Sequence, residues 1–569
     1  MKAKLILVLA FLLTFLSCQE KATKEEERVV GVLGQNGMVA SAHPIASEVG
    51  LEILKKGGNA YDAAIAVQFA LAVVYPGAGN IGGGGFLVYR KSDGEIGALD
   101  YREKAPGSAG RDMYLDENGE VIKGKSTRGH LAAGVPGSVD GMFKIHEKLG
   151  SLPMEELLQP AIDLAANGFL LTEREAGKLN RTKETFLETN TVAPTNLISD
   201  SVWHENDTIY YKDLAATLTR IKENGRDGFY AGETAKLIVE EMERGGGIMT
   251  EEDLAAYSAV WREPVTGVYK GHKVISMSPP SSGGVALMQL LKGIEPFDIK
   301  GWGHNSAQTV HTMVEIERRV YADRATHLGD ADFYDVPLEG LLADNYIQGR
   351  MSDIDPDKKT SSEDVVAGDV VPLPESLETT HFSVVDKEGN AASITTTLNG
   401  GFGCKVVVAG AGFFLNNEMD DFSVKPGHPN MFGLVGGEAN AIQPGKRMLS
   451  SMTPTIIEKD GKLLMVVGTP GGSTIITSVY QTILNVLDHG MTMQEAVNAQ
   501  KFHSQWLPDM VFHEPTAFDS TTVSQLTGMG HELKERSSLG RMDCILVWPD
   551  GSLEGASDFT RADNTSVGY

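Results

Sequence analysis

The feature that most constrains the fold is a threonine-rich β-hairpin in the last third of the 569-residue chain. Residues 379–386 and 391–398 both favour strands, and the turn signal Lys387-Glu388-Gly389-Asn390 separates them. In such a hairpin, alternate residues of each strand share one face. The pairing register therefore decides which side chains meet.

This register brings possible catalytic groups together. A hairpin centred on Glu388 pairs position i with position 776 − i, so Thr379 lies opposite Thr397 with both side chains on one face. Asn399 points to the same face, just beyond the strand. The spacing predicts a nucleophile, a second hydroxyl that orients it and an amide that binds substrate. The alternative is a threonine-rich edge hairpin without function, because threonine is an ordinary strand residue.

A threonine within a chain is a poor nucleophile, because nothing nearby takes its proton. At a new N-terminus, its own α-amino group can do so. The preceding segment, roughly residues 355–378, is polar and carries Pro372 and Pro374. A flexible run of this kind lets the scissile bond reach a tight geometry and lets the new end move away. We therefore expect cleavage between Glu378 and Thr379.

Charge and motif spacing exclude several functions. The formal net charge is −26, and such a surface repels phosphate backbones, so we expect no nucleic-acid partner. The histidines at 304, 311 and 327 lack the spacing of H-E-x-x-H, and we predict no metal. The glycine run 82–85 is not followed by Gly-Lys-Ser/Thr, so it predicts a tight turn into a strand instead of a phosphate-binding loop.

The N-terminus resembles an export signal. Lys2 and Lys4 precede an apolar run, residues 5–16, that is too short to span a bilayer as a mature helix. Ser17 and Cys18 follow, and a small residue before a cysteine is typical of a lipoprotein signal, residues 1–18 here. We expect export, with Cys18 acylated as the first mature residue and a lipid anchor in the membrane. The alternative is an ordinary signal peptide with an incidental cysteine.

The rest of the chain alternates helical and strand-like segments. Residues 44–56 have helical spacing that stops at Gly57-Gly58. Asn59 or Asp62 can cap a second helix, which is apolar nearly all round and therefore buried. The middle of the chain, about 150–350, is mainly helical, and the tail returns to β-structure.

Three other segments carry candidate binding groups. Arg102 ends a strand-like run. Three carboxylates within residues 418–421 follow another; their spacing is not that of an EF-hand, so they favour a substrate ammonium over calcium. Gly471 and Gly472 lie at a strand-to-helix junction, where unpaired amides can stabilise an oxyanion. The alternative for this junction is a plain glycine-rich turn.

Taken together, these segments resemble the γ-glutamyltranspeptidase family of N-terminal-nucleophile hydrolases from about residue 30 to Tyr569. The segments that carry the resemblance are 379–384 (Thr-Thr-His-Phe-Ser-Val), 415–423, 449–454, 470–473, 100–103 and 279–284. The resemblance implies an α/β fold with four layers, an αββα sandwich. It also implies one precursor cut into a large subunit, residues 19–378, and a small catalytic subunit, residues 379–569, which stay together.

The resemblance assigns roles to individual residues. Thr379 would be the nucleophile, Thr397 would orient it, and the amides of Gly471 and Gly472 would form the oxyanion hole. The residues that would bind the α-carboxylate of the γ-glutamyl group are Arg102, Ser450 and Ser451. Those that would bind its α-ammonium are Asn399, Glu418 and Asp421. A zwitterionic substrate needs one cationic and one anionic end in its pocket, and arginine binds a carboxylate through two parallel hydrogen bonds.

The implied reaction has two stages. The Thr379 hydroxyl first attacks the Glu378 carbonyl, and water cleaves the resulting ester. The freed amino group then assists attack on glutathione or another γ-glutamyl compound, and the γ-glutamyl ester passes to water or to an amino acid or dipeptide amine. No metal or organic cofactor is implied.

The family's lid over the pocket corresponds to residues 426–437. It carries Phe432 where the family often has a tyrosine that hydrogen-bonds the asparagine matched here by Asn399. We therefore expect the lid to close less firmly and the reaction to shift towards water as acceptor. Two other functions stay open. An acylase that removes glutaryl groups from β-lactams is disfavoured, because its substrate lacks the α-ammonium. An inactive, surface-anchored binding module would remain one uncut chain.

Overall fold

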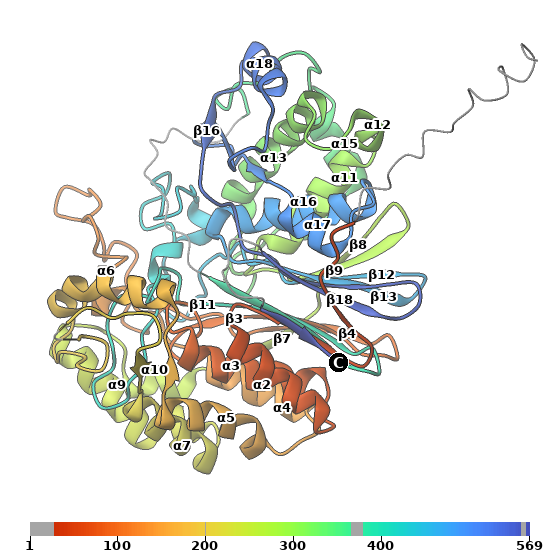
Figure 1. Cartoon of the computed structure of the whole chain (residues 1–569). Helices are drawn as coiled ribbons and strands as arrows, with labels where there is room; N and C mark the ends of the chain where they lie inside the picture. The colour runs from red at the N-terminus through yellow and green to blue at the C-terminus, as the bar shows by residue number, and fades with distance from the viewer. Residues whose placement is uncertain (1–27, 200, 366–378, 559–564) are drawn as a thin grey trace, which may run out of the picture.

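Two seven-stranded antiparallel sheets lie face to face, and helices cover the outer face of each (Figure 1). The computed structural model describes residues 28–199, 201–365, 379–558 and 565–569. The αββα sandwich expected from the sequence is confirmed. Cys18 and Glu378 lie outside the described residues, and so do residues 366–378 of the polar segment before Thr379.

The first sheet has the strand order β1-β18-β17-β13-β12-β9-β8. Its strands are β1 (Val32–Gly34), β18 (Leu553–Ser557), β17 (Asp543–Val547), β13 (Lys462–Val467), β12 (Thr455–Lys459), β9 (His272–Ser276) and β8 (Val265–Tyr269). The second sheet has the order β19-β2-β10-β11-β3-β4-β7. Its strands are β19 (Ser566–Gly568), β2 (Met38–Ser41), β10 (Thr380–Val385), β11 (Ala391–Thr397), β3 (Gly84–Arg90), β4 (Ile96–Asp100) and β7 (Val260–Arg262).

Both sheets combine strands from before and after position 379. In the first sheet, four strands of the C-terminal portion lie between β1 on one side and β9 with β8 on the other. In the second sheet, β2 lies between β19 and β10, and the hairpin of β10 and β11 separates β2 from β3. Each portion of the chain therefore completes the sheets of the other.

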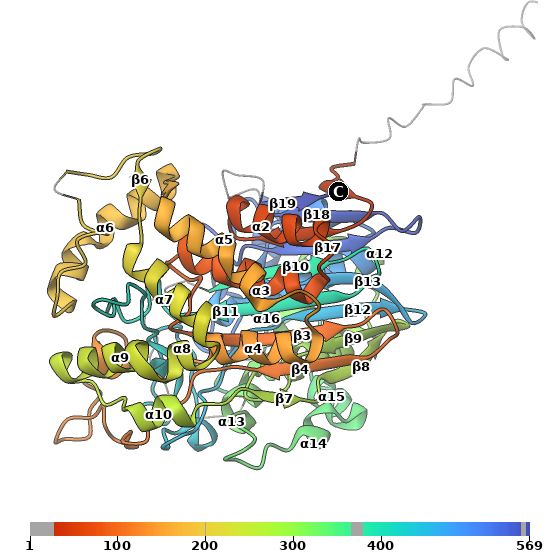
Figure 2. The same cartoon turned by 90° about the horizontal axis from the view of Figure 1, so that it is seen from below.

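One helical layer covers the second sheet (Figure 2). It and its extension consist of α2 (Pro44–Lys55), α3 (Ala60–Val74), α4 (Ser138–Leu149), α5 (Met154–Asn167), α6 (Glu173–Thr189), α7 (Lys212–Asn224), α8 (Asp227–Tyr230), α9 (Gly232–Gly245) and α10 (Glu251–Ala256). The layer on the first sheet and its extension consist of α11 (Gly283–Ile294), α12 (Ile299–Trp302), α13 (Ala307–His327), α14 (Leu338–Leu342), α15 (Asp344–Met351), α16 (Ile475–Leu487), α17 (Met493–Asn498) and α18 (Ser520–Gly528). Two small sheets lie outside the sandwich: β5 (Phe169–Leu170) with β6 (Thr208–Ile209), and β14 (Phe502–His503), β15 (Val511–His513) and β16 (Leu533–Glu535).

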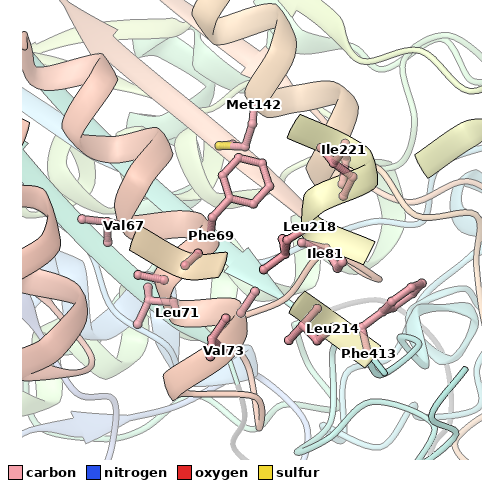
Figure 3. Close-up of a cluster of buried hydrophobic side chains, with 14 of the residues drawn as sticks. Val67, Phe69, Leu71, Val73, Ile81, Met142, Leu214, Leu218, Ile221 and Phe413 are labelled. Atoms are coloured by element: carbon pink, nitrogen blue, oxygen red, sulfur yellow. The ribbon is translucent and has the colours of Figure 1, made fainter. Parts of the chain in front are cut away.

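The first two helices confirm what their sequence predicts. The α2 helix ends before Gly57, and Asn59 caps α3 by accepting from the backbone N–H of Asp62, whose own side chain accepts from the Asn59 N–H. Every residue of α3 is buried. Figure 3 shows why: Phe69 and Val73 of α3 lie among Met142, Leu218 and other apolar side chains from the neighbouring helices.

The middle of the chain is mainly helical, as predicted, and it also supplies β7, β8 and β9. These strands are short, and β7 and β8 lie at the sheet edges, where partial exposure removes the continuous apolar run of a central strand. Among the described residues, no helix is both long and apolar enough to cross a membrane.

Candidate active site

The predicted hairpin is confirmed in type and in register. Its pairs run from Thr380 with Thr396 to Val385 with Ala391, which is the register centred on Glu388. The hairpin is not at an edge, since β10 also pairs with β2 and β11 with β3. Thr379 directly precedes β10, and both it and Thr397 are buried.

One pocket brings nearly all the predicted site residues together. Its lining includes nine of them: Arg102, Thr379, Thr397, Asn399, Glu418, Asp421, Ser450, Ser451 and Gly472. The other lining residues are Arg324, Phe432, Leu434, Met452 and Ile475. We call this the Arg102 pocket. Gly471, the remaining predicted catalytic residue, lines a second pocket that also contains Thr379.

Opposite charges meet inside the Arg102 pocket. The Arg102 guanidinium lies 2.6 Å from a carboxylate oxygen of Glu418 and 2.5 Å from one of Asp421. Burial disfavours the charge on Arg102, but these carboxylates and Glu103 raise its pKa above the ordinary value. Burial raises the pKa of both Glu418 and Asp421, and Arg102 opposes that rise. The pocket thus presents paired positive and negative groups, as a zwitterionic ligand requires.

A second buried guanidinium, that of Arg324 from α13, lies in the same pocket. It donates to the hydroxyl of Ser451 at 3.0 Å and to that of Ser282 at 2.9 Å. Ser282 in turn donates to the carbonyl of Ser450. Sequence reasoning missed Arg324, because it lies in the last turn of a long helix and no local motif distinguishes it. Only the fold brings it to the paired serines.

The glycine turn beside Thr379 has a geometry that only glycine fits. Gly471 has φ of 145° and Gly472 has φ of 56°. A Cβ at Gly471 would lie 2.5 Å from Oγ1 of Thr474, and one at Gly472 would lie 2.5 Å from the Phe432 ring. The turn begins the helical segment that continues into α16, where the first amides have no partner within the helix. Such amides can stabilise a negatively charged oxygen.

Hydrogen bonds hold the end of β11 in place. The Thr397 hydroxyl accepts from the backbone N–H of Asn399 at 2.7 Å. Asn80, in the turn before β3, donates to the carbonyl of Thr397 at 2.9 Å. The Asn399 amide donates to the carbonyl of Asn417 at 3.0 Å, which ties the hairpin to the segment carrying Glu418. Asn80 is a second residue that sequence reasoning missed.

The segment 426–437 covers the pocket. Its Asn430 amide donates to Asp421 at 3.0 Å, and the Asn430 side-chain oxygen accepts from the N–H groups of Phe432 and Leu434. The Met431 N–H donates to the Asp420 carboxylate at 2.8 Å. The segment is thus attached to the acidic residues instead of to Asn399. Whether it closes loosely, as Phe432 led us to expect, stays a prediction.

One cluster of potential metal ligands lies elsewhere. Ligand atoms of His311, Glu315 and His531 lie within 4.8 Å of one another, a grouping that the spacing of nearby histidines did not reveal. These atoms already contact one another and their neighbours. Nδ1 of His311 lies 2.8 Å from Nε2 of His531, and a carboxylate oxygen of Glu315 lies 2.8 Å from the Arg319 guanidinium. The adjacent positive charge opposes a cation, so we interpret the cluster as structural.

Comparison with known proteins agrees with this geometry. The gamma-glutamyltranspeptidase family model matches residues 46–568. The glutathione hydrolase proenzyme of Escherichia coli K12 is 46% identical over 96% of this chain and 94% of its own length.

Solved structures extend the likeness to three dimensions. Cephalosporin acylase from Bacillus halodurans aligns with a TM-score of 0.79 at 26% identity, over 95% of this chain and 97% of the acylase. Gamma-glutamyltranspeptidase of Helicobacter pylori aligns with a TM-score of 0.57 at 44% identity, over 61% of this chain and 97% of that chain. The chain therefore belongs to the gamma-glutamyltranspeptidase family.

Proposed function

We propose that this protein is a self-processing γ-glutamyltransferase and glutathione hydrolase in which Thr379 is the nucleophile. The observation that carries the proposal is the Arg102 pocket, in which a buried threonine lies beside matched positive and negative groups. The relatives of this chain include a glutathione hydrolase proenzyme, a name that implies a cut precursor.

Processing comes first in the proposed mechanism. The Thr379 hydroxyl attacks the carbonyl carbon of Glu378, the C–N bond breaks, and the amine of Thr379 leaves. Water then cleaves the ester. The products are a large subunit that ends at Glu378 and a small subunit that begins at Thr379.

Acyl transfer follows in the Arg102 pocket. Arg102, Ser450 and Ser451 bind the α-carboxylate of the γ-glutamyl group. Its α-ammonium displaces part of the Arg102 pairing and is held by the oxygens of Asn399, Glu418 and Asp421. The free amino group of Thr379 takes the hydroxyl proton as the oxygen attacks, and the Gly471 and Gly472 amides stabilise the oxyanion. One oxyanion-hole donor is typically worth about 3–4 kcal/mol in the transition state.

Replacement of the nucleophile tests the proposal. We expect purified wild-type protein to give two bands on a denaturing gel, with one fragment beginning Thr-Thr-His, and to release p-nitroaniline from γ-glutamyl-p-nitroanilide. Thr379→Ala should remain one band without activity, because the attacking oxygen is gone. Thr380→Ser, which changes the neighbouring hydroxyl residue, should still be cut. A processed and active Thr379→Ala protein would remove Thr379 from the mechanism.

The related acylase activity is the alternative for the same fold, because a cephalosporin acylase aligns over nearly the whole chain. The two carboxylates beside Arg102 argue against it, since a glutaryl group has no ammonium for them to bind. Hydrolysis of a glutaryl anilide at a rate equal to that of the γ-glutamyl anilide would favour the acylase.

We also propose that the precursor is exported and that Cys18 carries the lipid anchor of the mature protein. The charged start, the short apolar run and the Ser17-Cys18 pair support this. Intact-mass analysis of membrane-extracted protein tests it, with Cys18→Ser as the matched control. A wild-type large subunit of unmodified mass would contradict the anchor.

A further inference from the structure

Tyr321 of α13 contacts the glycine turn from the other portion of the chain. Its side chain is buried, and its hydroxyl donates to the backbone carbonyl of Ser473 at 2.5 Å. Ser473 lies in the 3₁₀ turn Gly472–Thr474, directly after the two glycines whose amides form the proposed oxyanion hole. A helix from before position 379 therefore holds a turn that belongs to the proposed small subunit.

Steric constraints alone do not fix this turn, because glycine adopts positive and negative φ about equally readily. Gly471 and Gly472 both have positive φ. Within the turn, the N–H and the hydroxyl of Thr474 both donate to the carbonyl of Gly471, at 3.0 and 2.8 Å. These bonds close the turn on itself, but they do not set its direction relative to Thr379. Contacts with other elements must do so, and the Tyr321 hydrogen bond is one of them.

The ring of Tyr321 is itself held in place. The His503 ring packs edge to face against it, with the ring centroids 5.6 Å apart and the planes at 80°. Nδ1 of His503 lies 2.8 Å from the hydroxyl of Thr477 in α16, and Nε2 lies 3.0 Å from the side-chain oxygen of Gln505. The Gln505 amide donates to the carbonyl of Phe432 at 3.3 Å. Burial lowers the pKa of His503 to about 3, so the Tyr321 ring packs against a neutral imidazole.

The α13 helix contacts two parts of the proposed site. Tyr321 and Arg324 are three residues apart, so their side chains are neighbours on the helix surface. Arg324 donates to the hydroxyl of Ser451, which belongs to the proposed α-carboxylate site, and Tyr321 bonds the turn that faces the γ-carbonyl group. One rigid helix thus links the groups proposed for the two ends of the γ-glutamyl substrate.

We propose that Tyr321 is a positioning residue for the oxyanion hole: its hydroxyl holds the glycine turn so that the amides of Gly471 and Gly472 face the oxygen of the γ-carbonyl group. The inference rests on the proposed function. When the Thr379 oxygen bonds to the γ-carbonyl carbon, an electron pair of the C=O bond moves onto that oxygen, and the two amides stabilise the negative charge. The same oxyanion forms again when water or an amine attacks the ester, so Tyr321 supports both halves of the reaction.

A misdirected turn weakens the transition state and leaves substrate binding intact. The Arg102 pocket binds the charged groups of the substrate, and Tyr321 is not among its lining residues. Loss of an interaction made only in the transition state lowers kcat and kcat/KM by the same factor. Deletion of an oxyanion-hole donor costs about 100- to 1,000-fold in kcat, and Tyr321→Phe only redirects the donors, so we expect a loss of about 10- to 100-fold.

The test compares wild type with Tyr321→Phe and Tyr480→Phe. Tyr480 in α16 is the matched control, because its ring is fully buried and its hydroxyl has no hydrogen-bond partner among the described residues. Initial rates with γ-glutamyl-p-nitroanilide give kcat and KM. The value of kcat is calculated per molecule of cut small subunit, so a lower yield of folded or processed protein does not count as a loss of turnover.

Two inhibitors separate positioning from a general disturbance of the pocket. L-Glutamate resembles the bound γ-glutamyl group. In the second inhibitor a boronic acid replaces the γ-carboxyl group: boron accepts an electron pair from the Thr379 oxygen, the hydroxyl proton passes to the free α-amino group, and the tetrahedral anion resembles the oxyanion. We expect Tyr321→Phe to weaken boronate binding by about 10-fold or more and glutamate binding by less than about 2-fold, because only the boronate needs the directed amides.

Tyr480→Phe should match wild type in kcat, KM and both inhibition constants. Equal weakening of the two inhibitors, or an unchanged kcat in Tyr321→Phe, would overturn the inference. A Tyr321→Phe preparation in which no chain is cut would also overturn it, because Tyr321 would then be needed before acyl transfer begins. Wild-type protein that does not cleave the anilide would instead reject the proposed function.

Discussion

At the scale of single residues, the two arginines of the Arg102 pocket have different surroundings. Arg102 contacts the carboxylates of Glu418 and Asp421, whereas Arg324 donates to the hydroxyls of Ser282 and Ser451. Burial lowers the pKa of Arg324, yet a guanidinium remains charged in proteins. Its positive charge is therefore directed, through Ser451, towards the place proposed for the substrate carboxylate.

Arg324 should position Ser451 and strengthen substrate binding. We expect Arg324→Gln to raise the KM for γ-glutamyl-p-nitroanilide by roughly 10-fold or more, since it removes a charged hydrogen bond inside a desolvated pocket. Arg324→Lys should raise KM less than Arg324→Gln does, because lysine keeps the positive charge. It should still raise KM, because lysine lacks the planar geometry that lets arginine bond both serines. Initial rates over a range of substrate concentrations separate KM from kcat.

A double-mutant cycle distinguishes positioning from a general loss of stability. If Arg324 acts through Ser451, then Ser451→Ala should raise KM much less in the Arg324→Gln background than in wild type. Additive effects of the two substitutions, with equal thermal stability of all four proteins, would contradict this role.

Single residues also mark the limit of prediction from sequence. Thr379, Thr397 and Asn399 could be placed on one face because a strand period of two and a turn signal fix their register. Arg102 could be named as a candidate from its place at the end of a strand, but its role, and the serines at 450 and 451, came only from resemblance. Arg324 and Asn80 could not be found at all, because their roles depend on contacts across more than a hundred residues of sequence.

At the scale of elements, strong local signals were predictable and weak ones were not. The end of α2 follows from the glycines after it, and the start of α3 follows from the capping asparagine. The burial of α3 follows from its apolar residues, which lie on all sides of the helix. The sequences of β7 and β8 show no clear strand periodicity. These strands form because they pair with neighbouring strands, β7 with β4 and β8 with β9. The segment 426–437 has no regular structure, so its attachment to Asp420 and Asp421 becomes visible only in three dimensions.

This covering segment depends on Asn430. Its side chain accepts from two backbone N–H groups of the segment and donates to Asp421, so Asn430→Ala should loosen the cover. We expect the KM for γ-glutamyl-p-nitroanilide to rise roughly 5- to 10-fold, as for the loss of one or two hydrogen bonds. His428→Ala, a change in the same segment, is the control. Equal KM values for both variants would mean that Asn430 does not hold the cover in place.

At the scale of the whole molecule, the burial of ionisable groups links stability to pH. Burial raises the pKa of Glu103 to about 8 from an ordinary 4.5, although Arg102 opposes this. The folded state keeps this proton longer than the unfolded state. The stabilisation is therefore complete below pH 4.5 and is lost as the pH rises through about 8. Glu418 and Asp421 act in the same direction, since burial raises the pKa of each.

Glu103→Gln should remove the Glu103 part of this dependence. Relative to wild type, we expect the variant to gain about 1.4 kcal/mol of unfolding free energy for each pH unit between about pH 5 and about pH 8. Denaturant unfolding at several pH values measures the difference. Glu155→Gln, which changes an exposed carboxylate of α5, should follow wild type. Parallel curves for Glu103→Gln and wild type would show that Glu103 is ionised in the fold.

The strand order also has a consequence for the order of folding and cleavage. Because each sheet combines strands from both sides of position 379, we expect the fold to be complete before the proposed scissile bond can reach its geometry. Self-cleavage is then expected only in correctly folded copies, and misfolded copies stay uncut and inactive. The step is also one-way. After thermal unfolding, two separate polypeptides would have to associate again, so we expect the cut protein to refold less readily than an uncut chain.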